Sequence, residues 1–524
     1  MKKILYSILA VAGLFVTSCD MSIPQPNVIP EDDGLQDVTD CLHYRNNIYN
    51  MLRVSTTGAY VYLTDLAMDQ FVGSVQNGNT NNDINTGNIT SSIGQATTLW
   101  ANYYAGIVSV NYFLINAQPI LDAIPEVQEY NTIEMKRYIA EAHFARAFFY
   151  FKLTETFCPN YTDANKDTNV GIPLREDFNP TSDKATYPGR STLYATYKFI
   201  EDELDAAYEG LKYYEENLPE EAQTQSLIAN SSFLSSWIVR ALQARVALLK
   251  GDYDTALTYA NEVIDNSSSF RCRLLGPSDY TGMVVNRKYD YVQMWKIDQG
   301  AELMFRPFAS NTELYIGSTG GGWLTKDEDA VNFLPVANVI NNYYTSNDLR
   351  REAFIGSQEL FNNGTSYNNV KTFIKWPGNV ELYTQADENN LRNMGKPFRI
   401  AEMYLIKMEC EYMTGKGDAL ATLNDFRKHR ILRYEDETYS GSELLGQIRA
   451  ERTKELIGEG FRLADCRRWK VEFTRVAGLG LGNLIVTGAD DVHYSADDYR
   501  YVWPIPADEI QVNPQLVGQQ NPGY

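Results

Sequence analysis

The chain has 524 residues, 44% of them hydrophobic, and a formal net charge of −21 at pH 7. This length supports a large globular core, and the negative charge argues against nucleic acid and anionic membrane surfaces as partners. An acidic composition rich in Tyr and Asn suits a neutral polar ligand such as a sugar. It suits a soluble extracytoplasmic surface equally well, so composition alone does not decide the function.

The first 34 residues predict export and anchoring rather than fold. Residues 1–18 combine two lysines, a short apolar run and small residues before Cys19, which is typical of a signal peptide. A cysteine at the cleavage point indicates a bacterial lipobox, so we expect Cys19 to carry lipid and anchor the protein to a membrane. The alternative is an ordinary secreted protein with a stray cysteine. Residues 19–34 are acidic and proline-rich and predict an extended tether, with the folded body beginning near Leu35.

Helical periodicity dominates the body, and the sequence therefore predicts a mainly α fold. The predicted helices, in chain order, span residues 40–52, 99–124, 132–157 and 191–214. Residues 235–265 predict a helical hairpin with its turn at Gly251 and Asp252, and residues 402–430 predict a second one with its turn at 415–418. Both hairpins have the spacing of a tetratricopeptide unit, in which small residues let two helices approach closely.

The two hairpins are separated by a stretch of different character, residues 270–393. Residues 291–297 and 301–308 are strand-like, and residues 317–323 form a Gly-rich loop that ends in Trp323. We interpret this stretch as a large irregular lobe with short strands, inserted into a tetratricopeptide-type helical scaffold. The scaffold is expected to comprise residues 35–269 and 394–524. Loops that a rigid scaffold holds are where binding residues usually lie.

The cysteines and histidines do not predict a metal or disulfide site. Five cysteines remain after Cys19, an odd number at wide spacing, and Cys410 and Cys466 sit in apolar helical patterns. The four histidines lack metal-ligand spacing, which argues against zinc. Residues 163–171 alternate Asp and Asn like calcium ligands, but Thr168 and Leu174 occupy the positions of the glycine and the bidentate glutamate. A polar surface turn is the favoured interpretation, with calcium the alternative; no other cofactor is expected.

Three patterns resemble catalytic motifs, and we interpret each as structural. The carboxylates could include a glycosidase pair, but such a pair depends on a spatial separation that sequence does not show. Residues 478–484, GLGLGNL, lack the flanking strand and helix of a dinucleotide site and predict a loop. A charged cluster near the C-terminus is expected to form structural ion pairs along one helix face. Its members are Arg449, Arg452, Glu455 and Glu459.

Four segments in order resemble one family. They are residues 140–157 (AEAHFARAFFYFKLTETF), 398–427, 448–470 (IRAERTKELIGEGFRLADCRRWK) and 502–524, which ends in Asn-Pro-Gly-Tyr. Together with the lipobox they make the chain similar to the SusD/RagB group of outer-membrane nutrient-binding lipoproteins. The resemblance implies a non-catalytic protein on the cell surface, which captures oligosaccharide and delivers it to a SusC-like TonB-dependent transporter. A peptide-capturing relative, a surface glycosidase and a structural tetratricopeptide scaffold are the alternatives.

Residues 75–92 provide the best local composition for binding sugar. Asn and Asp crowd this segment and cannot form core, and the resemblance implies that this region and a later aromatic loop together form the site. The polar candidates are Asn79, Asn82 and Asp83, with Trp323 as the platform on which a sugar ring stacks. Further aromatic candidates are Trp100, Tyr289, Tyr291 and Tyr315. For Trp323 and Trp100, packing against the body is the competing interpretation.

Overall fold

The computed structural model of the chain describes residues 34–218, 231–283, 286–310, 325–327, 330–379, 381 and 392–524. The α-helices are α2 (Val38–Ser55), α3 (Ala59–Leu66), α4 (Asn82–Asn85), α5 (Gly94–Asp122), α6 (Glu129–Phe157), α7 (Leu193–Asn217), α9 (Ser236–Lys250), α10 (Tyr253–Asp265), α11 (Asp290–Ile297), α12 (Leu349–Phe354), α13 (Ile400–Thr414), α14 (Ala419–Lys428), α15 (Gly441–Glu455), α16 (Arg462–Trp469) and α17 (Ala507–Val512). Shorter helical turns are η2 (Val75–Asn77), η3 (Glu126–Gln128), η4 (Lys184–Thr186), η7 (Val339–Tyr343), η8 (Gly482–Leu484), η9 (Tyr499–Tyr501) and η10 (Pro514–Leu516). The mainly α fold class is confirmed.

The strands are short and pair antiparallel, two at a time. The pairs are β1 (Phe71–Gly73) with β7 (Phe333–Pro335), β2 (Tyr280–Thr281) with β3 (Lys288–Tyr289), β4 (Leu303–Phe305) with β10 (Phe398–Arg399), β5 (Thr325–Asp327) with β6 (Ala330–Val331), β8 (Ile355–Asn362) with β9 (Thr365–Phe373) and β11 (Phe473–Arg475) with β12 (Val492–Tyr494). Most of these strands fall in the stretch 270–393.

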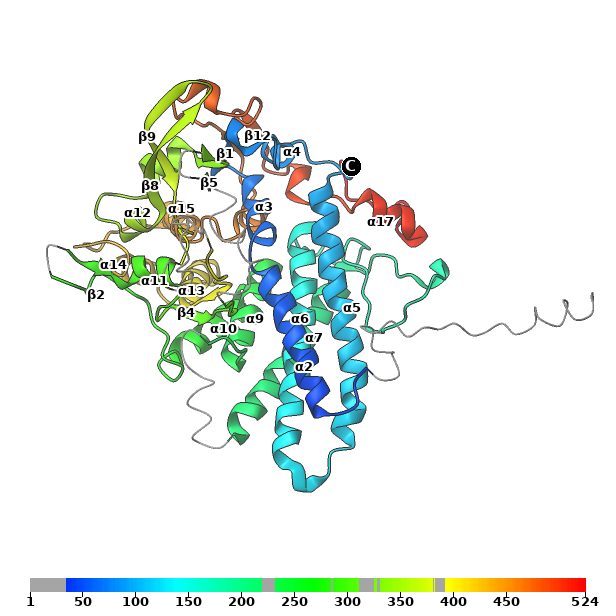
Figure 1. The fold of residues 1–524 in the computed structure, drawn as a ribbon. Helices are drawn as coiled ribbons and strands as arrows, with labels where there is room; N and C mark the ends of the chain where they lie inside the picture. The colour runs from blue at the N-terminus through cyan, green and yellow to red at the C-terminus, as the bar shows by residue number, and fades with distance from the viewer. Residues whose placement is uncertain are drawn as a thin grey trace, which may run out of the picture.

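Figure 1 shows the long helices α2, α5, α6 and α7 side by side. Helix α6 packs between α5 and α7, and α9 continues the row from α7 to α10. The helices approach closely where glycine faces a larger side chain: a Cβ on Gly106 of α5 would lie 2.6 Å from the ring of Phe149. Helix α10 packs directly against α13. The two hairpins that the irregular stretch separates in sequence are therefore neighbours in space.

The two helical hairpins have the same kind of turn, at the positions that the sequence predicted. Gly251 ends α9 and Gly415 ends α13, each in the left-handed conformation that glycine adopts without steric cost. Asp252 and Asp418 then cap the next helix by accepting a backbone N–H three residues ahead. Each turn stops one helix and starts its antiparallel partner.

The structure corrects one strand prediction and shortens another. Residues 291–297 form the helix α11, with Tyr291, Met294 and Trp295 buried. A short apolar run does not discriminate a buried strand from a buried helix, and here the i, i+3 and i+4 spacing decides. Of the run 301–308, only β4 is a strand.

The C-terminal segment docks on the body. Trp503 is fully buried, and its backbone N–H donates to the carbonyl of Thr156 at the end of α6 at 3.0 Å. Asn521 donates to the carbonyls of Phe157 and Trp503 at 2.9 and 2.6 Å. Earlier in the chain, residues 478–484 form a loop with the single turn η8, as predicted.

The five cysteines of the described chain are all buried thiols. Cys410 and Cys466, predicted to be small core residues, are fully buried. Burial raises the pKa of the Cys158 thiol to about 11 and raises that of Cys466 further. These thiols are therefore protonated at neutral pH and act as apolar packing residues.

A buried ion network centred on Glu455, the last residue of α15, joins the irregular lobe to the helical scaffold. The Glu455 carboxylate accepts from Arg430 Nε at 2.9 Å and from Arg399 Nη1 at 2.8 Å. The hydroxyl of Tyr291 in α11 donates to it at 3.2 Å. Burial raises the pKa of Glu455, but Arg430, Arg399 and Arg350 outweigh burial and hold that pKa well below its usual range.

The charged cluster is structural, but its partners are not the predicted ones. Arg452 pairs with Asp465 of α16 at 2.9 Å, and Glu459 pairs with Lys375 at 2.6 Å. Helix α15 ends at Glu455, so Glu459 lies beyond it and does not share its face. The expectation of pairs along one helix face was wrong because the acids and bases of this cluster bridge different elements.

We expect Glu455→Ala to destabilise the fold by about 3–5 kcal/mol, because it leaves buried guanidinium groups without their carboxylate. The folded pKa of Glu455 lies below the unfolded value of about 4.3. The carboxylate therefore contributes fully to the free energy of unfolding above about pH 4.3, and this contribution is lost as the pH falls through the folded pKa. Urea unfolding between pH 3 and 7 measures both effects. Glu443→Ala, an exposed glutamate in the first turn of the same helix, is the control and should cost less than about 1 kcal/mol. Equal costs for the two variants would contradict the prediction.

Candidate functional site

The Asn-rich segment 75–92 forms a surface turn whose base is fixed by one buried side chain. Asn85, fully buried, accepts from the Gly73 backbone N–H at 2.7 Å and donates to the carbonyls of Leu66 and Phe71 at 2.9 and 3.2 Å. One amide thus ties the turn to α3 and to β1. Helix α3 is held in turn by Asp65, whose carboxylate accepts the backbone N–H groups of residues 460 and 462 at 3.0 Å each.

The exposed part of the turn is ordered by its own side-chain amides. Asn77 Nδ2 donates to Asn82 Oδ1 at 2.7 Å, and Asn82 Nδ2 donates to Asn79 Oδ1 at 3.1 Å. The backbone N–H of Asn79 donates to Asn77 Oδ1 at 2.9 Å, closing the ring. Asn79 and Asn81 have φ values of 67° and 59°, the left-handed region that asparagine tolerates. The turn therefore presents polar groups in a fixed arrangement, with Asn79 and Asp83 exposed and Asn82 half-buried.

Gln76 connects this turn to the β8–β9 hairpin and to β6. Its Nε2 donates to the carbonyl of Phe361 in β8 at 2.9 Å, and its Oε1 accepts the Val331 backbone N–H at 3.0 Å. The ring of Phe361 is 52% exposed. Figure 1 shows α4, β1 and the β8–β9 hairpin at the same end of the molecule. An exposed phenylalanine is therefore joined to the Asn-rich turn through its backbone carbonyl.

The predicted platform residues Trp323 and Tyr315 lie outside the described residues. The strand that follows Trp323 is described: Thr325, two residues further on, pairs with Val331. Val331 is the residue that donates to Gln76. Strand β5 is thus connected to the Asn-rich turn through β6 and Gln76.

The structure places the remaining aromatic candidates away from this surface. Trp100 is 3% exposed and packs against Tyr104 and Phe157, with ring centroids 5.1 Å apart in both cases. Tyr291 is fully buried in the ion network. Tyr289 is half-buried on the β2–β3 ribbon, which Figure 1 shows far from α4. The structure therefore brings together Asn79, Asn82 and Asp83, and it does not bring these three aromatic rings to them.

Sequence reasoning missed Phe361 and Gln76. Phe361 precedes the turn residues Asn363 and Gly364, and an Asn-Gly pair between strand-like runs is a hairpin signal that could have located it. Gln76 carries no such signal, because its role depends on carbonyl and N–H groups from two distant segments.

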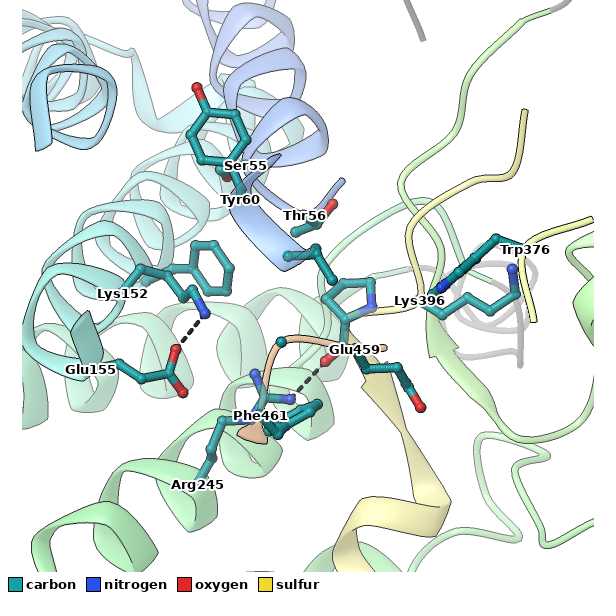
Figure 2. A pocket seen from close by; sticks show the side chains of 14 residues that line it. Ser55, Thr56, Tyr60, Lys152, Glu155, Arg245, Trp376, Lys396, Glu459 and Phe461 are labelled. Atoms are coloured by element: carbon teal, nitrogen blue, oxygen red, sulfur yellow. Dashed lines mark hydrogen bonds and ion pairs between the residues drawn. The ribbon is translucent and has the colours of Figure 1, made fainter. Parts of the chain in front are cut away.

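A hollow beneath α3 is too small for a sugar. Figure 2 shows it between Tyr60, the Lys152–Glu155 ion pair, Lys396 and Phe461. Its volume is about 40 Å³, enough for ordered water and not for a sugar ring. The charged groups on its wall already have partners, so it supports the packing of α3 rather than ligand binding. Lys152 pairs with Glu155, while Arg245, Lys396 and Glu459 pair with Glu402, Asp298 and Lys375, which do not line the hollow.

The stretch 163–171 is a surface turn, and its first acid is an ion-pair partner. Asp163 contacts Lys166 Nζ at 2.7 Å, and Asn165 Oδ1 accepts the Thr162 backbone N–H at 2.9 Å. Within the ranges that the structure describes, no group of three or more His, Cys, Asp or Glu side chains is placed to hold a metal ion. None of the helices in those ranges is long and apolar enough to cross a bilayer.

Comparisons with known proteins agree with this fold. A sequence profile of the SusD family matches residues 297–524, and a profile described as "Starch-binding associating with outer membrane" matches residues 38–235. The two matches follow one another along the chain and span most of it. The chain belongs to the SusD/RagB family, as its four sequence segments predicted. A comparison with curated protein sequences finds no match.

Solved structures show the same fold at low sequence identity. A SusD superfamily protein from Bacteroides thetaiotaomicron is 22% identical with a TM-score of 0.74, over 93% of this chain and 100% of that chain. Surface glycan-binding protein A from Bacteroides fluxus is 20% identical with a TM-score of 0.65, over 93% and 99% of the two chains. A laminarin-binding SusD-like protein is 20% identical with a TM-score of 0.63, over 94% and 100%.

We expect Asn82→Ala to loosen the Asn-rich turn without unfolding the protein. The substitution removes two side-chain hydrogen bonds, each worth about 0.5–1.5 kcal/mol. Amide hydrogen exchange should accelerate at Asn79, whose N–H depends on the orientation of Asn77, while the melting temperature hardly changes. Asp83→Ala, an exposed neighbour, is the control. Unchanged exchange at Asn79 in Asn82→Ala would refute the amide ring as the source of order.

Proposed function

We propose that this protein is a cell-surface lipoprotein that captures oligosaccharide and passes it, uncleaved, to a SusC-like TonB-dependent transporter. The observation that carries the proposal is the bridge made by Gln76, which joins the ordered Asn-rich turn to Phe361 and to Val331 in β6, the strand that pairs with β5. Amides that hydrogen-bond hydroxyls and aromatic rings that pack against C–H faces are the two kinds of contact a sugar needs. The names of the glycan-binding relatives support the same ligand class.

The charge of the surface favours a neutral glycan. Amides dominate the turn, with Asp83 as its exposed acid, and the whole chain carries a net charge of −21. An anionic polysaccharide would approach this end of the molecule against that charge. The proposed ligand is therefore a neutral oligosaccharide.

The perturbed carboxylates support binding without catalysis. Catalytic acids and bases commonly have shifted pKa values in an accessible cleft. Three of the carboxylates whose pKa values are lowered, Glu451, Glu455 and Glu459, have buried side chains that form ion pairs with arginine or lysine. Their charges stabilise the fold and are not available to a substrate.

Binding is tested with a panel of neutral oligosaccharides and calorimetry on the member that binds most tightly. Phe361→Ala and Trp323→Ala should each weaken binding about tenfold or more, because losing a buried aromatic face costs about 1.5–3 kcal/mol. Tyr130→Ala, at an exposed tyrosine near the start of α6, is the control and should bind normally. Normal affinity in both site variants would place the ligand elsewhere. Chromatography should return the oligosaccharide intact, and product that increases with protein concentration would favour a glycosidase.

Anchoring is tested separately at Cys19. In its native host, Cys19→Ala should move the protein from the membrane fraction to the soluble fraction, because the acyl chains that hold it would be missing. Protease added to intact cells should digest the wild-type protein. Membrane retention of Cys19→Ala would refute lipidation at this residue.

A further inference from the structure

A second cavity lies just beyond the C-terminal end of α6. The residues that line it are distant in sequence from the Asn-rich turn. Its volume is about 400 Å³, within the range of small-molecule sites. The loop after α6, the end of α16, η9 and the C-terminal segment form its wall, which includes Asn160, Arg467, Lys470, Asp497 and Tyr499. The ring of Tyr499 is 46% exposed.

The wall contains a buried cation without a carboxylate partner. Arg467 is 5% exposed, and its guanidinium donates only to neutral oxygens: Asn160 Oδ1 at 3.2 Å and the carbonyls of Glu155 and Tyr501 at 2.8 and 3.1 Å. Among the described residues no carboxylate forms an ion pair with it. Burial lowers the pKa of the Arg467 guanidinium, because removing the charged group from water disfavours the protonated form. Other buried arginines of the fold do pair with glutamate, including Arg45, Arg146 and Arg245.

A second guanidinium strengthens the positive potential behind the wall. Arg190, 4% exposed, donates to Asn521 Oδ1 at 2.7 Å and to backbone carbonyls, again to neutral oxygens. Two acids also line the cavity, but both are engaged. Asp498 pairs with Arg500 at 2.7 Å, and Asp497 pairs with Lys470 at 2.9 Å. The Lys470 and Asp497 side chains are largely exposed, so their pairing is weak. An ammonium group has three N–H donors, so Lys470 can contact a ligand and Asp497 together.

We propose that this cavity is a second ligand site, which takes a sugar that bears a carboxylate. The carboxylate lies toward Arg467 and Lys470, where charge-assisted hydrogen bonds are stronger than neutral ones. The C–H face of the ring packs against Tyr499, and Asn160, which is hydrogen-bonded to Arg467, also lines the cavity. The site is independent of the proposed neutral-glycan surface, because none of its lining residues belongs to the Asn-rich turn or the β8–β9 hairpin.

Calorimetry with D-glucuronate on the mature protein tests the proposal, with methyl β-D-glucoside as the uncharged probe. We expect saturable glucuronate binding that weakens as salt increases, and no saturable binding of the glucoside. Lys470→Gln should weaken glucuronate binding about tenfold. The matched control is Lys416→Gln, because Lys416 forms an equally exposed pair with Asp254 at 2.7 Å and should leave affinity unchanged.

Three results would overturn the second site. They are the absence of saturable glucuronate binding, equal binding of the glucoside, and equal losses in Lys470→Gln and Lys416→Gln. Asn82→Ala separates the two sites, since it should spare glucuronate binding whether or not the neutral-glycan surface exists. Loss of glucuronate binding in Asn82→Ala would mean that the cavity is not a separate site. Thermal melting of each variant verifies that it is folded.

Discussion

The rest of the structure depends on the buried pairing of Glu455 with Arg399 and Arg430. Glu455 ends α15, Arg399 ends β10, and Arg430 lies two residues beyond the end of α14. Glu302 joins them by pairing with Arg430 at 2.9 Å. Burying these charges costs free energy, and the ion pairs offset that cost only when each partner is in place. The network therefore fixes how the irregular lobe sits on the helical scaffold.

The same network positions the two halves of the proposed glycan surface. Just beyond α15, Glu459 is held by Lys375, and the Gly460 backbone N–H donates to Asp65 of α3. Helix α3 in turn holds Asn85, which fixes the Asn-rich turn. On the other side, Lys375 follows β9 closely, so the base of the hairpin that bears Phe361 is anchored at the same point. One buried cluster thus sets the relative position of the polar turn and the aromatic ring.

The sequence predicted the helices and their turns because these features are local. Amphipathic spacing, Gly251 and Gly415 as helix stops, and Asp252 and Asp418 as caps each act within a few residues. Family resemblance predicted Asn79, Asn82 and Asp83 as the polar half of the proposed site, and this stays a prediction. The burial of Trp100, the partners of Glu459 and the bridge made by Gln76 depend on segments far apart in the chain. For those features no local pattern distinguishes a core residue from a ligand residue.

The most direct test of the central claim is hydrogen exchange measured with and without a saturating neutral oligosaccharide. If the turn and the hairpin form one surface, protection should increase together at residues 77–83 and 358–366 and remain unchanged at the start of α6. Protection that develops at only one of these two segments, or at neither while the oligosaccharide is bound, would contradict a shared site.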